Sequence, residues 1–274
     1  MSAVGVRVSP EWLILREPAD AAARSAELAE RLRRHLPAAG RLVIHDLGGG
    51  SGAMGRWLAP RLPGPQHWVV HERDAGLLKL AVADAPGLAA DGAAVTVEGR
   101  RSDITRLAPG DLAGASLIVA SALLDMLTAD ELARMLGACI GFGRCPMLLA
   151  LTFVGRVALT PADPLDVRLA AAFNAHQRRT TTAGRVLGPD AVAAAVDELR
   201  GAGAEFVVRP SPWRLDAAHA ELAAEWFGGW VAAACEQEPA LATQAGAYRD
   251  RRLAQARAGG LAVTVDHADL LVLP

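Results

Sequence analysis

The sequence predicts an α/β fold: a doubly wound, mostly parallel sheet of seven strands with helices on both faces. Two observations lead to this prediction. Short apolar runs alternate with amphipathic stretches along most of the 274 residues, which is the order in which parallel strands and crossover helices follow one another. The apolar runs are also nearly continuous, as is typical of strands that are buried on both faces.

Five predicted strands precede a long irregular stretch, and two follow it. They are residues 41–47, 68–72, 94–98, 117–121 and 147–154, then 205–209 and a strand within 261–273. Capping signals support helices between them, with Asp74 after the second strand and a capping box of Thr128 and Glu131 after the fourth. A helical region over 216–258 is expected to be interrupted at Gly228-Gly229 and at Pro239.

The composition argues against several classes of protein. There are 28 Lys and Arg residues against 30 Asp and Glu, so we expect no basic surface for nucleic acid. The three cysteines have no CxxC spacing, so neither a disulfide framework nor a metal site is predicted. The apolar runs are far shorter than the roughly 20 residues that cross a bilayer, and the N-terminus does not read as a signal peptide. We expect a cytoplasmic protein that binds neither nucleic acid nor membranes.

The most specific signal is a glycine-rich turn after the first predicted strand, in the sequence VIHDLGGGSGAMG at 43–55. Glycine lets the backbone turn tightly and approach a ligand closely, and the helix that follows offers free N–H groups. Glu72 ends the second strand, 20 residues after Gly52, where a carboxylate can accept both hydroxyls of an adenosine ribose. Asp103 follows the third strand. Together they predict a site for an adenosine cofactor.

Two adenosine cofactors could use such a turn. Residues 50–55 match GxGxxG, the pattern of nicotinamide dinucleotide sites. Asp46 argues against a dinucleotide, because a carboxylate directly before the glycines would sit poorly beside a pyrophosphate. It suits a cofactor that carries a positively charged amino group.

These motifs resemble those of the class I S-adenosylmethionine-dependent methyltransferases. Residues 46–52, DLGGGSG, resemble the acid-x-G-x-G-x-G motif, 72–81 the second-strand motif, 102–104 the adenine-binding acid and its apolar neighbour, and 116–127 the fourth-strand motif. The resemblance implies a Rossmann-like fold with S-adenosyl-L-methionine as cofactor. It implies a cofactor site made of Asp46, Gly48, Gly50, Gly52, Glu72, Asp103, Ile104 and Ser121.

We expect a single domain over residues 1–274. Its parts are an N-terminal helical cap (1–40), a cofactor-binding half (41–154), a substrate-side insertion after the fifth strand (155–187) and a C-terminal half (188–274). Within the first part, Asp20 is the expected N-cap of a helix that runs along Leu28, Leu32 and Leu36.

Methyl transfer requires an aligned acceptor, exclusion of water and, for some acceptors, a base. Ligands of open α/β sheets bind at the carboxyl ends of the strands, so Asp125, after the fourth strand, is the first candidate base. Many members of the family have histidine at this place. His176, after the fifth strand, is the second candidate. A turn residue and a solvated helix face are the alternatives for these two positions.

Insertions after the fifth strand often line the acceptor pocket in similar methyltransferases. In this chain the insertion carries three polar residues near His176, which are predicted to bind the acceptor: Asn174, Gln177 and Arg178.

The sequence therefore predicts methyl transfer from S-adenosylmethionine to an oxygen or nitrogen of a small metabolite or secondary metabolite, by a monomer or homodimer. A nicotinamide-dependent oxidoreductase is the first alternative, disfavoured by Asp46 and by the lack of a recognisable tyrosine–lysine pair. A non-catalytic cofactor-binding protein is the second, because methyl transfer demands no obligatory catalytic residue.

Overall fold

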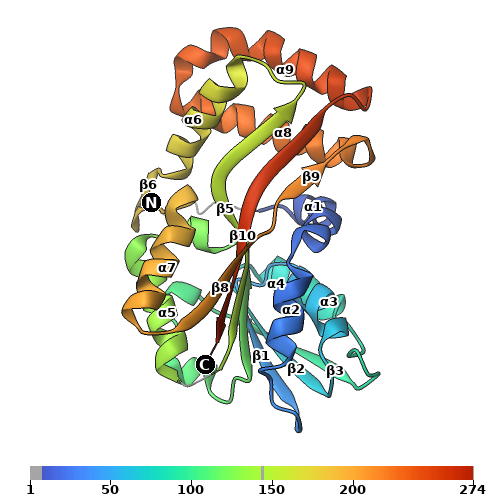
Figure 1. The fold of residues 1–274 in the computed structure, drawn as a ribbon, viewed down its shortest axis with the longest axis vertical. Helices are drawn as coiled ribbons and strands as arrows, with labels where there is room; N and C mark the ends of the chain where they lie inside the picture. Colours follow the sequence, from blue (N-terminus) through green and yellow to red (C-terminus); the bar gives the residue numbers. More distant parts are fainter. Residues whose placement is uncertain (1–7, 143–144, 274) are drawn as a thin grey trace.

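A central sheet organises the computed structural model, which describes residues 8–142 and 145–273 (Figure 1). Within these residues the sheet has eight strands, in the order β3-β2-β1-β4-β5-β10-β8, with β9 paired to β10 beside this path. The strands are β1 (Leu42–Leu47), β2 (Gln66–Glu72), β3 (Val95–Arg101), β4 (Leu117–Ser121), β5 (Met147–Thr160), β8 (Glu205–Pro210), β9 (Trp213–Leu215) and β10 (Ala262–Leu273).

The pairing confirms the predicted mostly parallel sheet. β1, β2, β3, β4 and β5 pair in parallel, and of the seven strands along the path only β10 runs antiparallel to its neighbours, β5 and β8. β9 is an additional short strand that the sequence did not predict. The carboxyl ends of the parallel strands meet at one edge of the sheet, where ligands of such folds bind.

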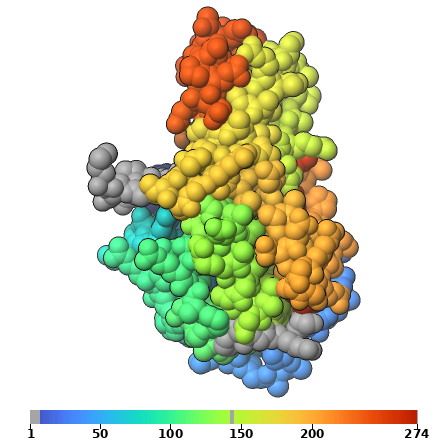
Figure 2. Space-filling view, turned by 90° about the vertical axis from the view of Figure 1, so that its left-hand side faces the viewer, coloured from blue at the N-terminus to red at the C-terminus, as the bar shows by residue number. Residues whose placement is uncertain are grey.

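Helices cover both faces of the sheet, as predicted. On one face α2 (Ala26–Arg33) and α3 (Ala53–Leu58) pack on alternate residues of β1, including Ile44, and α4 (Ala75–Ala83) packs beside them on Gly99 of β3. On the other face α5 (Ala129–Phe142) and α7 (Ala191–Gly201) pack on Leu47, Ile118 and Leu149. Figure 2 looks onto this second face, where α5 (green) and α7 (orange) lie side by side below α6 (yellow).

The first helix, α1 (Pro10–Ala23), begins earlier than predicted. Ser9 caps α1 by accepting the N–H of Trp12, and Ser25 caps α2 by accepting the N–H of Leu28. Asp20, the predicted N-cap, instead lies in the last turn of α1. Its carboxylate there accepts hydrogen bonds from Arg16 of the same helix and from Trp213 of β9. Asp20 therefore caps neither helix, and serine residues cap both.

β5 and β10 continue past the rest of the sheet and carry a group of helices at one end of the molecule (Figure 1). We call this the distal lobe: the outer halves of β5 and β10 with α6 (Leu165–Gln177), α8 (Ala220–Gln237) and α9 (Ala242–Arg257). Its core combines aliphatic side chains with aromatic ones, among them Phe153, Phe227, Trp230 and Tyr248.

The predicted insertion at 155–187 is mostly regular structure. β5 runs to Thr160 rather than to residue 154, then come α6 and a hairpin of β6 (Thr180–Thr181) and β7 (Gly184–Arg185). The sequence did not reveal the outer half of β5 or α6. Both have short apolar faces, and the stretch also contains polar and proline residues.

α8 runs through Gly228 and Gly229, where an interruption was predicted. The helix face built around Phe227 and Trp230 is buried, and this burial outweighs the roughly 1 kcal/mol that each glycine costs. Pro239 does end the helix, as expected. Among the described helices, none is long and apolar enough to cross a membrane.

Candidate functional site

The glycine turn joins β1 to α3 at the carboxyl end of the sheet. Gly48, Gly50 and Gly52 have φ of 64°, 55° and 85°, in the left-handed region that favours glycine. Gly49 has an ordinary φ but no room, because a Cβ there would lie 2.7 Å from Val70 Cγ1. The turn therefore requires glycine at four places, and for Gly49 the reason is packing.

Asp46 lies directly behind this turn and is completely buried. Neither of its carboxylate oxygens has a hydrogen-bond partner among the described residues. Burial raises the pKa of Asp46 to about 7; the charge of Glu72 adds to the rise, while that of Arg24 opposes it. A buried carboxylate without a partner is costly, so this position is typical of a binding site.

Glu72 joins the glycine turn to the start of α4. One carboxylate oxygen accepts the N–H of Gly50 (3.1 Å) and the other that of Asp74 (2.9 Å). These bonds fix the carboxylate at the end of β2. An ionised carboxylate has about four lone-pair sites, so it retains capacity for ligand hydroxyls.

Asp103 and Ile104 follow β3, and Asp103 lines a cavity of about 450 Å³ with Ser102, Arg100 and His71. Asp103 also caps the next turn by accepting the N–H of Thr105. Ile104 is buried against the face that carries α5. The glycine turn does not line this cavity, so the structure places the predicted cofactor residues at one sheet edge but not around one cavity.

Ser121 ends β4, and its hydroxyl accepts a hydrogen bond from Arg24 Nη2 (3.1 Å). Sequence reasoning did not single out Arg24. A lone arginine near the end of a helix carries no motif, so its burial was not visible in the sequence.

Asp125 lies in a short turn after β4, and its Oδ1 is shielded from solvent without a partner among the described residues. Burial raises its pKa to about 6, partly opposed by the charges of Arg16 and Arg179. This carboxylate is largely ionised at neutral pH and is basic enough to accept a proton, which is what a general base requires.

His176 lies near the end of α6, half-buried. Its Nδ1 is shielded and unpaired within the described part of the chain, and its Nε2 lies 3.4 Å from Glu236 Oε2. Asn174, two residues earlier, donates to the Gly155 carbonyl (2.8 Å). Gln177 is half-buried at the last position of the helix.

Arg178 forms a two-bond ion pair with Asp190, at 2.6 and 2.7 Å, and this partner raises its pKa. The ion pair occupies one edge of the guanidinium. The adjacent Arg179 has no carboxylate partner within residues 8–142 and 145–273, and its charge acts on Asp125. Of the two arginines, Arg179 is therefore the freer to meet a ligand.

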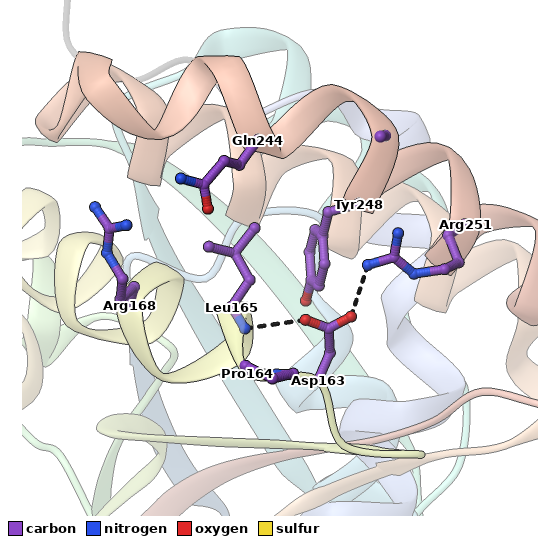
Figure 3. A pocket seen from close by; sticks show the side chains of 8 residues that line it. Asp163, Pro164, Leu165, Arg168, Gln244, Tyr248 and Arg251 are labelled. Carbon is purple, nitrogen blue, oxygen red and sulfur yellow. Dashed lines mark hydrogen bonds and ion pairs between the residues drawn. The ribbon is translucent and has the colours of Figure 1, made fainter.

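A second cavity, of about 330 Å³, lies in the distal lobe (Figure 3). It is lined by the start of α6 and one face of α9, with Asp163 paired to Arg251 at 2.7 Å. None of the predicted site residues lines it, and Figure 1 shows α9 at the opposite end of the molecule from β1–β3.

No known protein-family model and no curated protein sequence matches the chain. Solved structures do match. The cyclopropane synthase MmaA2 from Mycobacterium tuberculosis aligns with a TM-score of 0.51 and 13% identity, over 97% of this chain and 95% of that one. A SAM-dependent methyltransferase from Methanosarcina mazei aligns with a TM-score of 0.47 and 12% identity, over 89% and 96%. Geranyl diphosphate C-methyltransferase from Streptomyces coelicolor A3(2) aligns with a TM-score of 0.46 and 11% identity, over 90% and 80%.

The alignment with the cyclopropane synthase covers nearly all of both chains. The chain has the fold of the class I S-adenosylmethionine-dependent methyltransferases.

Proposed function

We propose that this protein transfers a methyl group from S-adenosyl-L-methionine to a small-molecule acceptor. The observation that carries the proposal is Asp46, a fully buried carboxylate without a partner directly behind the glycine turn. An unpaired charge in this environment costs several kcal/mol, which a cationic ligand group would offset. The amino group of S-adenosylmethionine supplies such a charge, whereas the pyrophosphate of a nicotinamide dinucleotide would repel Asp46.

The residues around the turn fit this cofactor. Backbone N–H groups at the start of α3 face the carboxyl end of the sheet, and Glu72 retains lone pairs for the ribose hydroxyls. We assign the adenine to Asp103 and Ile104, after β3. Gly48, Gly50, Gly52 and Ser121 complete the proposed cofactor site.

The N-terminal helices are proposed to cap this site. A Cβ at Gly50 would lie 3.5 Å from Leu13 of α1, and Glu17 of α1 forms an ion pair with Arg56 of α3 at 2.6 Å. α1 therefore lies against the glycine turn and the helix that follows it, where it would exclude water from the cofactor.

When bound, S-adenosylmethionine supplies a methyl group already activated by its sulfonium. The protein then has to position the acceptor, exclude water and, for an O–H or N–H acceptor, accept a proton. We assign the proton to Asp125, whose Oδ1 is shielded from solvent and whose carboxyl has a pKa of about 6. His176 is the second candidate base, and Asn174, Gln177 and Arg178 are proposed to position the acceptor.

The choice of an oxygen or nitrogen acceptor rests on this base. The similar structures include a cyclopropane synthase and a C-methyltransferase by name, so acceptors with a reactive carbon belong in the same assay. Asp125→Asn should lower turnover with O–H or N–H acceptors by at least 100-fold and leave cofactor affinity unchanged. Equal turnover in wild type and variant would remove Asp125 from the mechanism.

The direct test of the proposal is a thermal-unfolding series with S-adenosylhomocysteine and with NAD. At 100 times its dissociation constant a ligand adds about 2.7 kcal/mol of stability. For a chain of this size that is a rise of roughly 5–10 °C in Tm. We expect the rise with S-adenosylhomocysteine and none with NAD, and a smaller rise in the Glu72→Ala variant. The reverse pattern would support the oxidoreductase alternative.

A further inference from the structure

Arg24 places a charged guanidinium inside the protein, next to the glycine turn. The residue follows α1 directly and is only 4% exposed. Nη2 donates to Ser121 at the end of β4, and the guanidinium carbon lies 5.6 Å from the ring centre of Trp57 in α3. Nε and Nη1 are buried and meet no acceptor within residues 8–142 and 145–273. The side chain therefore holds donors in the region between β4 and α3 that no described group uses.

Burial lowers the pKa of Arg24, and the charges of three carboxylates oppose this effect: Asp20, Asp269 and Asp46. Asp20 accepts bonds from an arginine and a tryptophan side chain, and Asp269 accepts two backbone N–H groups. Asp46 is free, yet no hydrogen bond joins it to Arg24 among the described contacts. Ser121, the partner of Arg24, lies two residues beyond Val119 in β4, and Val119 pairs with Asp46 in β1. Two buried groups of opposite charge thus lie in one region at the ends of adjacent strands, both with unused polar atoms.

We propose that Arg24 binds the carboxylate of the cofactor's amino-acid end while Asp46 binds its amino group, an assignment that rests on the proposed function. An α-amino acid carries both charges on one carbon, and it therefore matches a cation and an anion that are close but not paired. The guanidinium has five N–H donors, and the bond to Ser121 uses one of them. The remaining donors allow the two-bond contact with a carboxylate that arginine favours.

This assignment makes Arg24 a specificity-determining residue that lies outside every motif of the glycine turn. It predicts that the site distinguishes an adenosine ligand with an intact amino acid from one without it. A purely structural role for Arg24 predicts no such distinction, because loss of structure would weaken the binding of both ligands alike.

The experiment measures dissociation constants of two probes by calorimetry. S-adenosylhomocysteine carries the amino acid, and 5′-methylthioadenosine keeps the adenosine and the sulfur but lacks it. The proteins are wild type, Arg24→Gln and the matched control Arg61→Gln. Arg61 is exposed, and its guanidinium carbon lies 4.7 Å from the centre of the Trp57 ring, so the control also removes a guanidinium from this indole.

We expect Arg24→Gln to weaken the affinity for S-adenosylhomocysteine about 100-fold and to change the affinity for 5′-methylthioadenosine by less than about threefold. Arg61→Gln should change neither. An equal loss for both probes, or no loss for S-adenosylhomocysteine, overturns the assignment while the proposed cofactor site stands. If wild type binds neither probe, the proposed function itself fails and the assignment falls with it.

A measurement on the wild-type protein keeps the test decisive if Arg24→Gln does not fold. The decarboxylated analogue of S-adenosylhomocysteine keeps the amino group and lacks only the carboxylate. It should bind about 100-fold more weakly than S-adenosylhomocysteine. Equal affinities would show that no group in the site recognises the carboxylate, and Arg24 would lose its assignment.

Discussion

Asp46 and Arg24 are both buried, and each leaves polar atoms without a partner in the described part of the chain. Such groups lower the stability of the free protein, because desolvation of a charge is only partly offset by charges at a distance. Residues that break the ordinary rules of burial are expected at functional sites.

The raised pKa of Asp46 gives a prediction for pH. With a pKa of about 7, much of this carboxyl carries a proton at pH 6 in the free protein, whereas the ammonium group of the ligand would bind the ionised form. Binding of S-adenosylhomocysteine should therefore release a proton below pH 7. Affinity should rise by roughly tenfold per pH unit at pH 5–6 and level off above pH 7. Calorimetry in buffers of different ionisation enthalpy measures this proton.

Asp46→Asn is the control for this pH dependence. The variant should bind more weakly and lose the proton release, because an amide does not titrate. Retention of the same pH profile would assign it to another group, with Asp125 the next candidate. Stability of the free protein changes with pH in the opposite direction: the raised pKa of Asp46 favours the folded state below the unfolded value of about 3.8, and this contribution is lost as pH rises through 7.

The sequence singled out part of the proposed site at this scale. Asp46 and the left-handed glycines were recognisable because a motif fixes residue types at fixed spacing. Arg24 was not, because its burial depends on the packing of α1 against β4 and α3. Arg178 was singled out as a polar residue near His176, and its bond to Asp190 depends on a fold-back of the chain that local spacing does not reveal.

At the scale of elements, Asp269 in β10 joins three segments. Its carboxylate accepts the N–H of Ser25 at the start of α2 and the N–H of Leu151 in β5, both at 2.8 Å. Leu151 has φ of 55° at an irregularity in the β5–β10 pairing. The carboxylate therefore stabilises a strained strand position and the junction that carries Arg24.

Asp269→Ala should destabilise the protein markedly. It leaves two N–H groups without their acceptor, each at a cost of about 1–3 kcal/mol, so Tm should fall by roughly 5–20 °C. Asp91→Ala is the matched control, since Asp91 also accepts two backbone N–H groups but is exposed, where water replaces it. Equal effects of the two variants on Tm would refute this account of Asp269.

Gly229 in α8 offers the opposite prediction. It lies in the middle of an 18-residue helix, it is exposed, and a Cβ there would meet no atom within 4 Å. Gly229→Ala should stabilise the protein by about 0.5–1 kcal/mol, which raises Tm by roughly 1–4 °C. The same substitution at Gly52 should lower Tm, because Gly52 has φ of 85° and its Cβ would lie 3.1 Å from Ala81 Cα. A fall in Tm for Gly229→Ala would mean that α8 needs the glycine.

Elements with a strong local signal were predicted almost residue by residue. β4 begins at Leu117 and ends at Ser121 as expected, because a continuous apolar run is bounded by polar residues. β5 was predicted too short, since its outer half pairs with β10 over a distance of about 100 residues in sequence, and such pairing leaves no local mark. The prediction of a break in α8 was wrong, because glycine indicates only a backbone preference and carries no information on the burial of the opposite helix face.

At the scale of the whole molecule, β5 and β10 connect the distal lobe to the rest of the fold. Leu148 and Leu271 belong to the core beneath α2 and α3, and Leu149 and Leu270 to the core beneath α5 and α7. The outer halves of the same strands enter the core of the distal lobe. The distal lobe cannot unfold without losing half of the β5–β10 pairing. The cores are therefore coupled through two continuous strands.

This coupling predicts one cooperative thermal transition in calorimetry, with equal calorimetric and van't Hoff enthalpies. Phe227→Ala in the distal lobe and Leu28→Ala in the core beneath α2 each remove a fully buried side chain, at a cost of about 2–5 kcal/mol. Both should lower the Tm of the same single transition. S-adenosylhomocysteine, proposed to bind at the glycine turn, should raise the Tm of that whole transition in either variant. Two separate transitions, of which the ligand shifts only one, would show that the distal lobe folds as an independent unit.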